Sequence, residues 1–478
     1  MPRAPRSDKI TVVGEGLVGS LLSIGLRRRG FEVEVYERRG DPRAGKAAAG
    51  RSINLALSAR GLHALKELGL DQKVLSRAIP MYGRMIHPLS AETSLQPYGR
   101  DPSEHINSIS RGWLNAVLME EAESLGASIH FERRAVSYDF KTGTLGLRDT
   151  AGRTLERRAP VVIGADGAGS AIRQEIMNLP RTRYSQEYLE HGYKELSIPP
   201  GPGGSFQLEK NALHIWPRGR YMLIALPNFD GSFTCTLFLP FEGPLSFEAL
   251  DGPDKVLSFF SRQFPDALAL MPHLAEEFFA NPTGHMVMLR CLPWHAGGQA
   301  LLIGDAAHAM VPFYGQGMNC GFEDCSVLWE CLDQEPPRRG SAPGAAAWGA
   351  LFERFTRLRK PNADAISEMA LENFVEMRDK VAQPRFQLEK KVERLLQERF
   401  PERYIPRYSL VTFSRVPYRL AQRAGEIQAR LLSQLCEGLS RAEDVDWAKA
   451  ESLIGRELAP LLDDEQVQAG LATHARLS

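Results

Sequence analysis

The sequence lacks the features of membrane, secreted and nucleic-acid-binding proteins. No segment approaches the roughly 20 consecutive apolar residues that a membrane-spanning helix needs, and the N-terminus has no apolar stretch of the kind found in secretory signals. Lys plus Arg and Asp plus Glu both number 58, so the formal net charge is zero. A balanced charge gives no reason to expect nucleic acid or an anionic membrane surface as a partner. We therefore expect a cytoplasmic protein.

Cysteine is also scarce. The chain has six cysteines among 478 residues, and none shows the paired spacing of a zinc site or of a CxxC redox motif. A chain of this length does not need disulfides for stability. We expect reduced thiols, no metal site, and enough buried surface for two closely packed domains.

The N-terminal segment has the pattern of a nucleotide-binding unit. A predicted strand over Lys9–Val13, a helix over Leu17–Arg29 and a strand over Phe31–Glu37 follow one another. The sequence GEGLVG, from Gly14 to Gly19, lies between the first two elements. This spacing lets the backbone turn tightly and approach a pyrophosphate at the helix N-terminus, and the acidic residue that ends the second strand can accept hydrogen bonds from ribose.

Two further glycine-rich turns follow predicted strands. Ala159–Ile163 leads into GADGAGS, which begins at Gly164, and Ala300–Ile303 leads into Gly304 and Asp305. Between them, short β-rich segments predict an antiparallel sheet: His214–Trp216, Tyr221–Leu226 and Ser232–Leu239. A loop is expected over the Pro-, Gly- and Ala-rich segment Glu335–Gly349. The remaining chain has helical periodicity, clearest in Ala363–Lys380, Phe386–Arg399 and Val416–Leu439.

The order of these turns resembles that of the class A flavoprotein monooxygenases, which are FAD-dependent aromatic hydroxylases. The GxGxxG turn comes first, then a DG motif with Asp166, Ser170 and Arg173, then a GD segment from Gly304 to Asn319. The resemblance implies an α/β fold with a GR2-type Rossmann-like FAD-binding domain, an antiparallel-sheet substrate domain and a helical C-terminal region. The implied boundaries are FAD-binding parts at 1–80, 106–180 and 291–335, a substrate domain at 81–105 and 181–290, and C-terminal helices at 350–478 that complete the substrate site.

The resemblance also implies which residues contact FAD. Asp305 would hold a ribityl hydroxyl, and the helix that starts at Gly317 would direct its dipole to the pyrimidine end of the flavin. Arg111 would touch the flavin phosphate or ring edge, and Val136 would contribute backbone contacts to the adenine. Asp166 could instead cap the following helix. The full implied set is Gly14, Gly16, Val18, Gly19, Glu37, Arg38, Arg111, Val136, Asp166, Asp305, Gly317, Met318 and Asn319.

Longer matches are similar to the branch of this family that hydroxylates kynurenine. They are GRSINLALSARG from Gly50, LHIWPRG from Leu213, PFYGQGMNCGFED from Pro312, ENF from Glu372 with MRD from Met377, and YSLVTF from Tyr408. They imply a substrate site in which Arg84 binds the carboxylate, with Arg84 and Tyr98 on two facing strands. The implied substrate residues are Arg84, Tyr98, Asn373 and Tyr408, and the implied wall is Pro312, Phe313 and Gly315.

This resemblance implies a monooxygenase that uses NADPH or NADH. Reduced FAD would activate O₂ as a C4a-hydroperoxide, and L-kynurenine would become 3-hydroxykynurenine. No obligate acid–base pair is expected, and His308 is interpreted as a structural hydrogen-bonding residue. Two alternatives stay open: a same-fold hydroxylase of another aromatic acid, and a non-catalytic FAD-fold carrier. Eukaryotic members have a C-terminal membrane anchor, whereas Val416–Ser478 is charged throughout, which favours a soluble, bacterial-type enzyme without an anchor.

Overall fold

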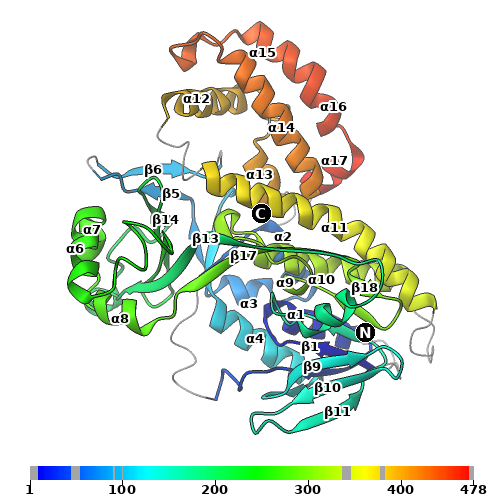
Figure 1. Cartoon of the computed structure of the whole chain (residues 1–478). Coiled ribbons are helices and arrows are strands. Elements are labelled where there is room, and N and C mark those ends of the chain that lie inside the picture. Colours follow the sequence, from blue (N-terminus) through cyan, green and yellow to red (C-terminus); the bar gives the residue numbers. More distant parts are fainter. Residues whose placement is uncertain are drawn as a thin grey trace.

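A computed structural model of the chain (Figure 1) describes residues 9–44, 54–89, 92–99, 101–335, 346–376 and 383–472. Residues 50–53 and 377–379 of the sequence motifs, and 336–345 of the predicted loop, lie outside the described residues. Within the described part, no helix is both long and apolar enough to cross a membrane, and all six cysteines are buried and unpaired.

The nucleotide-binding part is built on a six-stranded sheet. Its strand order is β18-β19-β12-β1-β2-β8, with β18 as an antiparallel edge and the other neighbours parallel. The strands are β1 (Lys9–Val13), β2 (Glu32–Tyr36), β8 (Ser128–His130), β12 (Val162–Gly164), β18 (His295–Ala296) and β19 (Ala300–Leu302). Helix α1 (Leu17–Arg28) packs against α4 (Arg111–Ser124) and α10 (Gly317–Gln334). The three strands that precede the glycine-rich turns are adjacent, so the turns lie at one edge of the sheet.

A seven-stranded sheet forms the second layer (Figure 1). Its order is β17 (Gly284–Leu292), β13 (Arg183–Ile198), β16 (Phe233–Pro240), β15 (Met222–Pro227), β14 (Ala212–Pro217), β5 (Gly83–Ile86) and β6 (Ser94–Pro97). The predicted antiparallel strands are therefore present, whereas the long strand β13 was not predicted. Helices α6 (Pro253–Gln263), α7 (Pro265–Leu268) and α8 (Leu274–Ala280) share an apolar core with this sheet.

Two three-stranded sheets flank the nucleotide-binding part. One contains β3 (Asn54–Leu57), β7 (Ile106–Ser110) and β4 (Ile79–Met81), and the other β9 (Arg134–Asp139), β10 (Thr144–Arg148) and β11 (Thr154–Arg158). The pairing of β9 with β10 skips Val136, which is therefore a bulge residue. Short helices α2 (Ala59–Glu67), α3 (Asp71–Leu75), α5 (Ala171–Met177) and α9 (Asp305–His308) complete this part.

The C-terminal region is helical, as predicted, but its first helix begins earlier than expected. Helix α11 spans Ala346–Val375 and continues through Pro361, whereas the loop was predicted to extend to Gly349 and the helical region to begin at residue 350, with its clearest periodicity from Ala363. Proline in a helix interior usually breaks it. Here buried side chains on both sides of the proline, including Phe355 and Ile366, hold the helix together by packing. The other helices are α12 (Pro384–Arg399), α13 (Arg407–Thr412), α14 (Tyr418–Leu435), α15 (Trp447–Leu453), α16 (Ala459–Leu462) and α17 (Glu465–Ala472).

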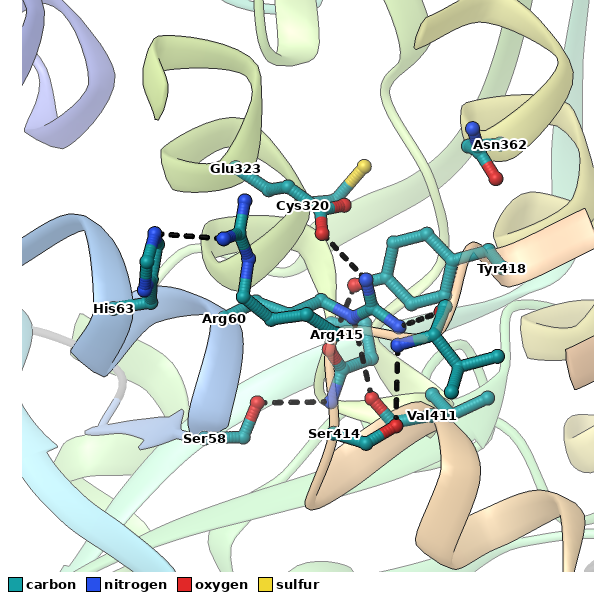
Figure 2. A network of polar contacts seen from close by, with 12 residues as sticks. Ser58, Arg60, His63, Cys320, Glu323, Asn362, Val411, Ser414, Arg415 and Tyr418 are labelled. Atoms are coloured by element: carbon teal, nitrogen blue, oxygen red, sulfur yellow. Dashed lines mark hydrogen bonds and ion pairs between the residues drawn. The ribbon is translucent and has the colours of Figure 1, made fainter. Parts of the chain in front are cut away.

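A buried network of charges joins this helical region to the nucleotide-binding part (Figure 2). Arg60 of α2 has a fully buried side chain and pairs with Glu323 of α10 at 2.5 Å. It also donates to the carbonyl oxygens of Val411 and Val416. Arg359 of α11 binds Glu323 at 2.6 Å. Burial alone would raise the pKa of Glu323, but the two guanidinium groups hold that pKa below its usual value.

We expect Arg60→Ala to lower the free energy of unfolding by about 3–5 kcal/mol, because it leaves a buried carboxylate with one partner fewer and two carbonyls unpaired. Arg153→Ala is the control, since Arg153 pairs with Asp149 from a side chain that is 77% exposed, and its loss should cost about 1 kcal/mol or less. Urea unfolding of both variants measures the difference. Equal midpoints would contradict a stabilising role for the network.

A second polar cluster lies on the seven-stranded sheet. His87, which follows β5, contacts Asp266 through Nδ1 at 2.7 Å and His214 through Nε2 at 2.9 Å. The other ring nitrogen of His214 lies 2.8 Å from the carbonyl oxygen of Glu209. A carbonyl oxygen only accepts, so Nε2 of His214 carries the proton and Nδ1 accepts from His87. Burial is the main cause that lowers the pKa of His214 to about 4.

This cluster predicts acid sensitivity. Below pH 6.5 the unfolded chain protonates His214, while the folded chain resists protonation until about pH 4. The contribution of neutral His214 to the free energy of unfolding is thus fully present above pH 6.5 and is lost as the pH falls toward 4. The loss between pH 7 and pH 5 is about 2 kcal/mol. His214→Gln should lose less stability than the parent over the same interval. Thermal unfolding at both pH values checks this, and an unchanged pH dependence would contradict it.

Candidate active site

The first two glycine-rich turns pack against each other at the edge of the six-stranded sheet. Gly14 has a φ of +99°, and a Cβ atom there would lie 2.5 Å from the carbonyl oxygen of Ala165, so the position requires glycine. Gly16 is the N-cap of α1, and a Cβ atom there would meet nothing within 4 Å. The N-terminus of α1 therefore faces open space, as an anion-binding helix N-terminus requires.

Two acidic side chains lie beside this turn. Glu37 accepts hydrogen bonds from the backbone N–H groups of Glu15 at 2.8 Å and Arg39 at 2.9 Å, one on each carboxylate oxygen. Each oxygen keeps a second acceptor site, which suits a ribose hydroxyl. Burial raises the pKa of Glu15 to about 8. An uncharged Glu15 adds no negative charge where a pyrophosphate would bind.

Four other predicted cofactor residues differ in their surroundings. Arg38 and Arg111 are exposed, and Arg111 is the first residue of α4. Val136 is the bulge residue of β9, where backbone groups left out of the ladder can bind a base. The Val18 side chain fills the space that a Cβ atom on Gly304 or Gly321 would need. The glycine at position 321 therefore lets α1 pack closely on α10.

The two carboxylate oxygens of Asp166 differ, because one caps a helix and the other has no hydrogen-bond partner among the described residues. Its Oδ2 accepts from the N–H of Ala171, the first residue of α5, at 2.7 Å. The helix-capping alternative is therefore present in the structure. Its Oδ1 is buried and has no hydrogen-bond partner among the described residues, and burial raises the pKa of Asp166. A buried acceptor without a partner is costly, and a ligand hydroxyl at this edge would satisfy it.

The third turn leads toward α10. Asp305 is exposed directly after Gly304, while Gly315 has a φ of +67° just before the helix begins at Gly317. The Asn319 side chain is fully buried, with Nδ2 donating to the carbonyl oxygens of Ala56 and Gly315. A contact between Asn319 and a flavin would therefore have to come from its backbone.

His308 has the structural surroundings that were expected of it. It is buried, and its Nε2 lies 2.6 Å from Asp324 Oδ2. Cys320 lies close to this pair, but Arg359 already pairs with Asp324 at 2.7 Å. A protein cation thus supplies the positive charge in this cluster, and these residues do not fit a metal ion.

The residues at these turns fit FAD. Open space at Gly16, an unpartnered oxygen on Asp166, an exposed Asp305 and the N-terminus of α10 are all placed along one edge of the sheet. Such an edge binds dinucleotides in open α/β sheets.

Three of the predicted substrate residues come together in the structure. The Arg84 guanidinium lies 5.4 Å from the ring centroid of Tyr98 and 5.0 Å from that of Tyr408, and the two rings stack at 5.5 Å. No carboxylate pairs with Arg84 among the described residues, and its titratable neighbours there are tyrosines. The Tyr98 hydroxyl is buried without a well-formed hydrogen bond there, although Arg84 and Tyr408 interact with it electrostatically. The arrangement offers a cation and hydroxyl groups to an anion.

An apolar surface adjoins this cation. Leu213 on β14 is the register partner of Arg84 on β5, and it belongs to an apolar cluster with Met81, Ile106, Leu226, Phe413, Ala56, Tyr98, Ile224 and Tyr408. Cation and apolar surface together suit a small aromatic acid.

The fourth predicted substrate residue contacts the wall of the site. Asn373 donates through Nδ2 to the carbonyl oxygen of Phe313 at 2.8 Å. The ring of Phe313 stacks on Phe374 at 4.3 Å and lies 5.0 Å from the ring of Phe238. The structure thus connects Asn373 to the predicted wall, and adds Phe374 and Phe238, which the sequence interpretation missed although Phe374 lies in a quoted motif.

Comparisons with known proteins show the family to which the chain belongs. The family model of the FAD binding domain matches residues 8–188 and 275–343. A kynurenine 3-monooxygenase of Myxococcus xanthus is 57% identical over 96% of this chain and 97% of its own length. A kynurenine 3-monooxygenase of Xanthomonas oryzae is 48% identical over 96% and 99%, and one of Stenotrophomonas maltophilia 46% over 96% and 99%.

Solved structures show the same fold at low identity. A 2-methyl-3-hydroxypyridine-5-carboxylic acid oxygenase has a TM-score of 0.62 and 21% identity over 80% of this chain and 95% of its own. The Pseudomonas aeruginosa protein PqsL, solved in complex with 2-aminobenzoylacetate, has a TM-score of 0.60 and 19% identity over 78% and 96%. By its FAD-binding domain and its full-length relatives, the chain belongs to the kynurenine 3-monooxygenase family of FAD-dependent enzymes.

Proposed function

We propose that this enzyme hydroxylates L-kynurenine at ring carbon 3, ortho to the ring amino group, and that it consumes NADPH or NADH and O₂. The observation that carries the substrate assignment is Arg84, which lies beside two stacked tyrosine rings and an apolar cluster, with no carboxylate partner among the described residues. Kynurenine has the matching parts, a carboxylate and an aminophenyl ring.

Arg84 binds the substrate carboxylate in this proposal. A guanidinium in a partly buried site forms charge-assisted hydrogen bonds that are stronger than those between neutral groups. The Tyr98 and Tyr408 hydroxyls lie beside it and can donate to the same carboxylate, because burial raises the pKa of each and keeps it protonated. The aminophenyl ring then lies against the apolar cluster that contains Leu213 and Ile224.

FAD would bind along the edge formed by the three glycine-rich turns. The N-terminus of α1 at Gly16 would face the pyrophosphate, Glu37 a ribose, Val136 the adenine, Asp305 the ribityl chain, and the N-terminus of α10 the pyrimidine end of the ring. When bound and reduced, FAD activates O₂ for transfer of one oxygen atom to the ring. The other oxygen leaves as water, with two electrons and protons from NAD(P)H and solvent.

The chain itself positions the ring and excludes water. Phe313 would form part of the wall next to the reacting atoms, and its stacking on Phe374 and the bond from Asn373 fix its place. Water that reaches the activated oxygen releases it as H₂O₂, so a dry and rigid wall favours hydroxylation.

The decisive experiment is incubation of the purified yellow protein with L-kynurenine, NADPH and O₂. We expect a product 16 mass units heavier than kynurenine, identified as 3-hydroxykynurenine by chromatography. Anthranilate, a phenolic acid and tryptophan serve as competing substrates. Faster NADPH consumption and hydroxylation with one of these would reassign the substrate, and a colourless protein that takes up no added flavin would contradict the FAD enzyme altogether.

Arg84→Ala should raise KM for kynurenine about 10- to 100-fold, the equivalent of the 1.5–3 kcal/mol of a charged hydrogen bond, while FAD stays bound. Kynuramine, which has no carboxylate, is the control ligand, and the parent and the variant should bind it equally. A variant that loses affinity for both ligands alike would show that Arg84 shapes the pocket rather than binding the carboxylate.

A further inference from the structure

Gln316 lies directly before α10, in a segment that two glycines flank. It is the N-cap of the helix and stands between Gly315 and Gly317, in the segment that would meet the flavin ring in the proposed function. Its side chain is buried at 3% exposure. A buried amide needs partners for both its oxygen and its nitrogen, so the groups that bind it determine where this segment lies.

The two partners of Gln316 come from distant parts of the chain. Its Nε2 donates to Ser58 Oγ at 3.4 Å, a long contact. Its Oε1 accepts from the Tyr418 hydroxyl at 2.9 Å. Burial raises the pKa of Tyr418 well above its usual value, so the hydroxyl remains a donor. The shorter bond therefore comes from the first residue of α14, in the C-terminal region.

Tyr418 is itself held in place by the buried charge network. The Arg60 guanidinium lies 3.8 Å from the centroid of its ring, and the same guanidinium pairs with Glu323 and donates to the Val416 carbonyl oxygen. Figure 2 shows Arg60 against the Tyr418 ring, with Glu323 and Val411 around it. A cation–π contact in a fully desolvated site is strong, so Tyr418 is a rigid support.

The segment has other anchors, but they lie on the nucleotide-binding side. Asn319 donates to the Ala56 and Gly315 carbonyl oxygens, and accepts from the N–H of Ser58 at 2.9 Å. These bonds fix the start of α10 to β3 and α2. The Tyr418 bond adds a support from the C-terminal helices, on which Tyr408 of the substrate site also lies.

We infer that Tyr418 is a positioning residue for the flavin ring. Through Gln316 it fixes the backbone from Gly315 to Gly317, and so links the packing of the C-terminal helices to the geometry of the ring-facing segment. The inference rests on the placement of FAD in the proposed function, because only that placement brings this segment against the ring. The adenosine and pyrophosphate parts would bind at the other two turns and would not sense Tyr418.

The test compares Tyr418→Phe with Tyr404→Phe. The first substitution removes the bond to Gln316 and keeps the ring below Arg60. The second is a matched control, since Tyr404 is also fully buried in the C-terminal region and its hydroxyl has no hydrogen-bond partner among the described residues. For each protein we would measure the thermal midpoint, the dissociation constants of FAD and of ADP from the flavin-depleted chain, and the ratio of H₂O₂ to hydroxylated product.

The expected result is about fivefold weaker FAD binding in Tyr418→Phe, the equivalent of one hydrogen bond, with unchanged ADP binding and a higher share of H₂O₂. Tyr404→Phe should match the parent in FAD binding, in ADP binding and in the share of H₂O₂. Gln316→Ala removes the contact with Ser58 as well as the bond from Tyr418, so it should weaken FAD binding at least as much as Tyr418→Phe. The double variant should be no worse than Gln316→Ala alone, because the Tyr418 bond is already lost in that variant.

Two outcomes would overturn the inference. One is a Tyr418→Phe enzyme with parental FAD affinity and parental H₂O₂ share. The other is an equal loss of FAD and ADP binding, which would show general loosening of the fold. Failure of the proposed function can be distinguished from failure of this inference. A parent enzyme that binds FAD but does not hydroxylate kynurenine would refute the proposed substrate. The difference between FAD and ADP binding would still test the role of Tyr418.

Discussion

The side-by-side ends of three parallel strands constrain the rest of this molecule. The register aligns Val13 of β1 with Gly164 of β12, and Gly164 with Leu302 of β19, so three turns that are far apart in sequence meet at one sheet edge. The two long segments between these turns must leave the sheet and return to it. Much of the second segment becomes the seven-stranded sheet, and the proposed substrate site therefore lies next to the edge where FAD would bind.

Helix α10 extends from the proposed flavin edge into the core. Its N-terminus would give positive potential to the flavin ring in the proposed function, while Glu323 and Asp324 lie buried farther along it. Two buried carboxylates are tolerated only with charged partners, and Arg60 and Arg359 supply them from α2 and α11. The pairing leaves the helix little freedom to rotate or slide, since either movement would strand a buried charge.

Local sequence signals predicted the parts of the fold that local physics determines. GEGLVG between a strand and a helix, and the strands around Trp216 and Leu226, needed no long-range information. The joint placement of Arg84, Tyr98 and Tyr408 followed from family resemblance, because spacing does not bring residues 84 and 408 together. The predicted loop extended into the first turn of α11, and the continuity of this helix through Pro361 depends on buried packing, which is tertiary. The contact of Arg60 with Tyr418 has no local signal at all.

Helix α11 connects the helix behind the proposed cofactor edge with the wall of the proposed substrate site. Arg359 on this helix binds the acidic pair of α10, and Asn373 on the same helix binds the Phe313 carbonyl oxygen in the wall. Fourteen residues of helix separate them, or about 20 Å at 1.5 Å per residue. A bend at Pro361 would change the distance between these two attachment points. The buried packing that carries α11 through its proline therefore does more than stabilise a helix, because it fixes the wall relative to the N-terminus of α10.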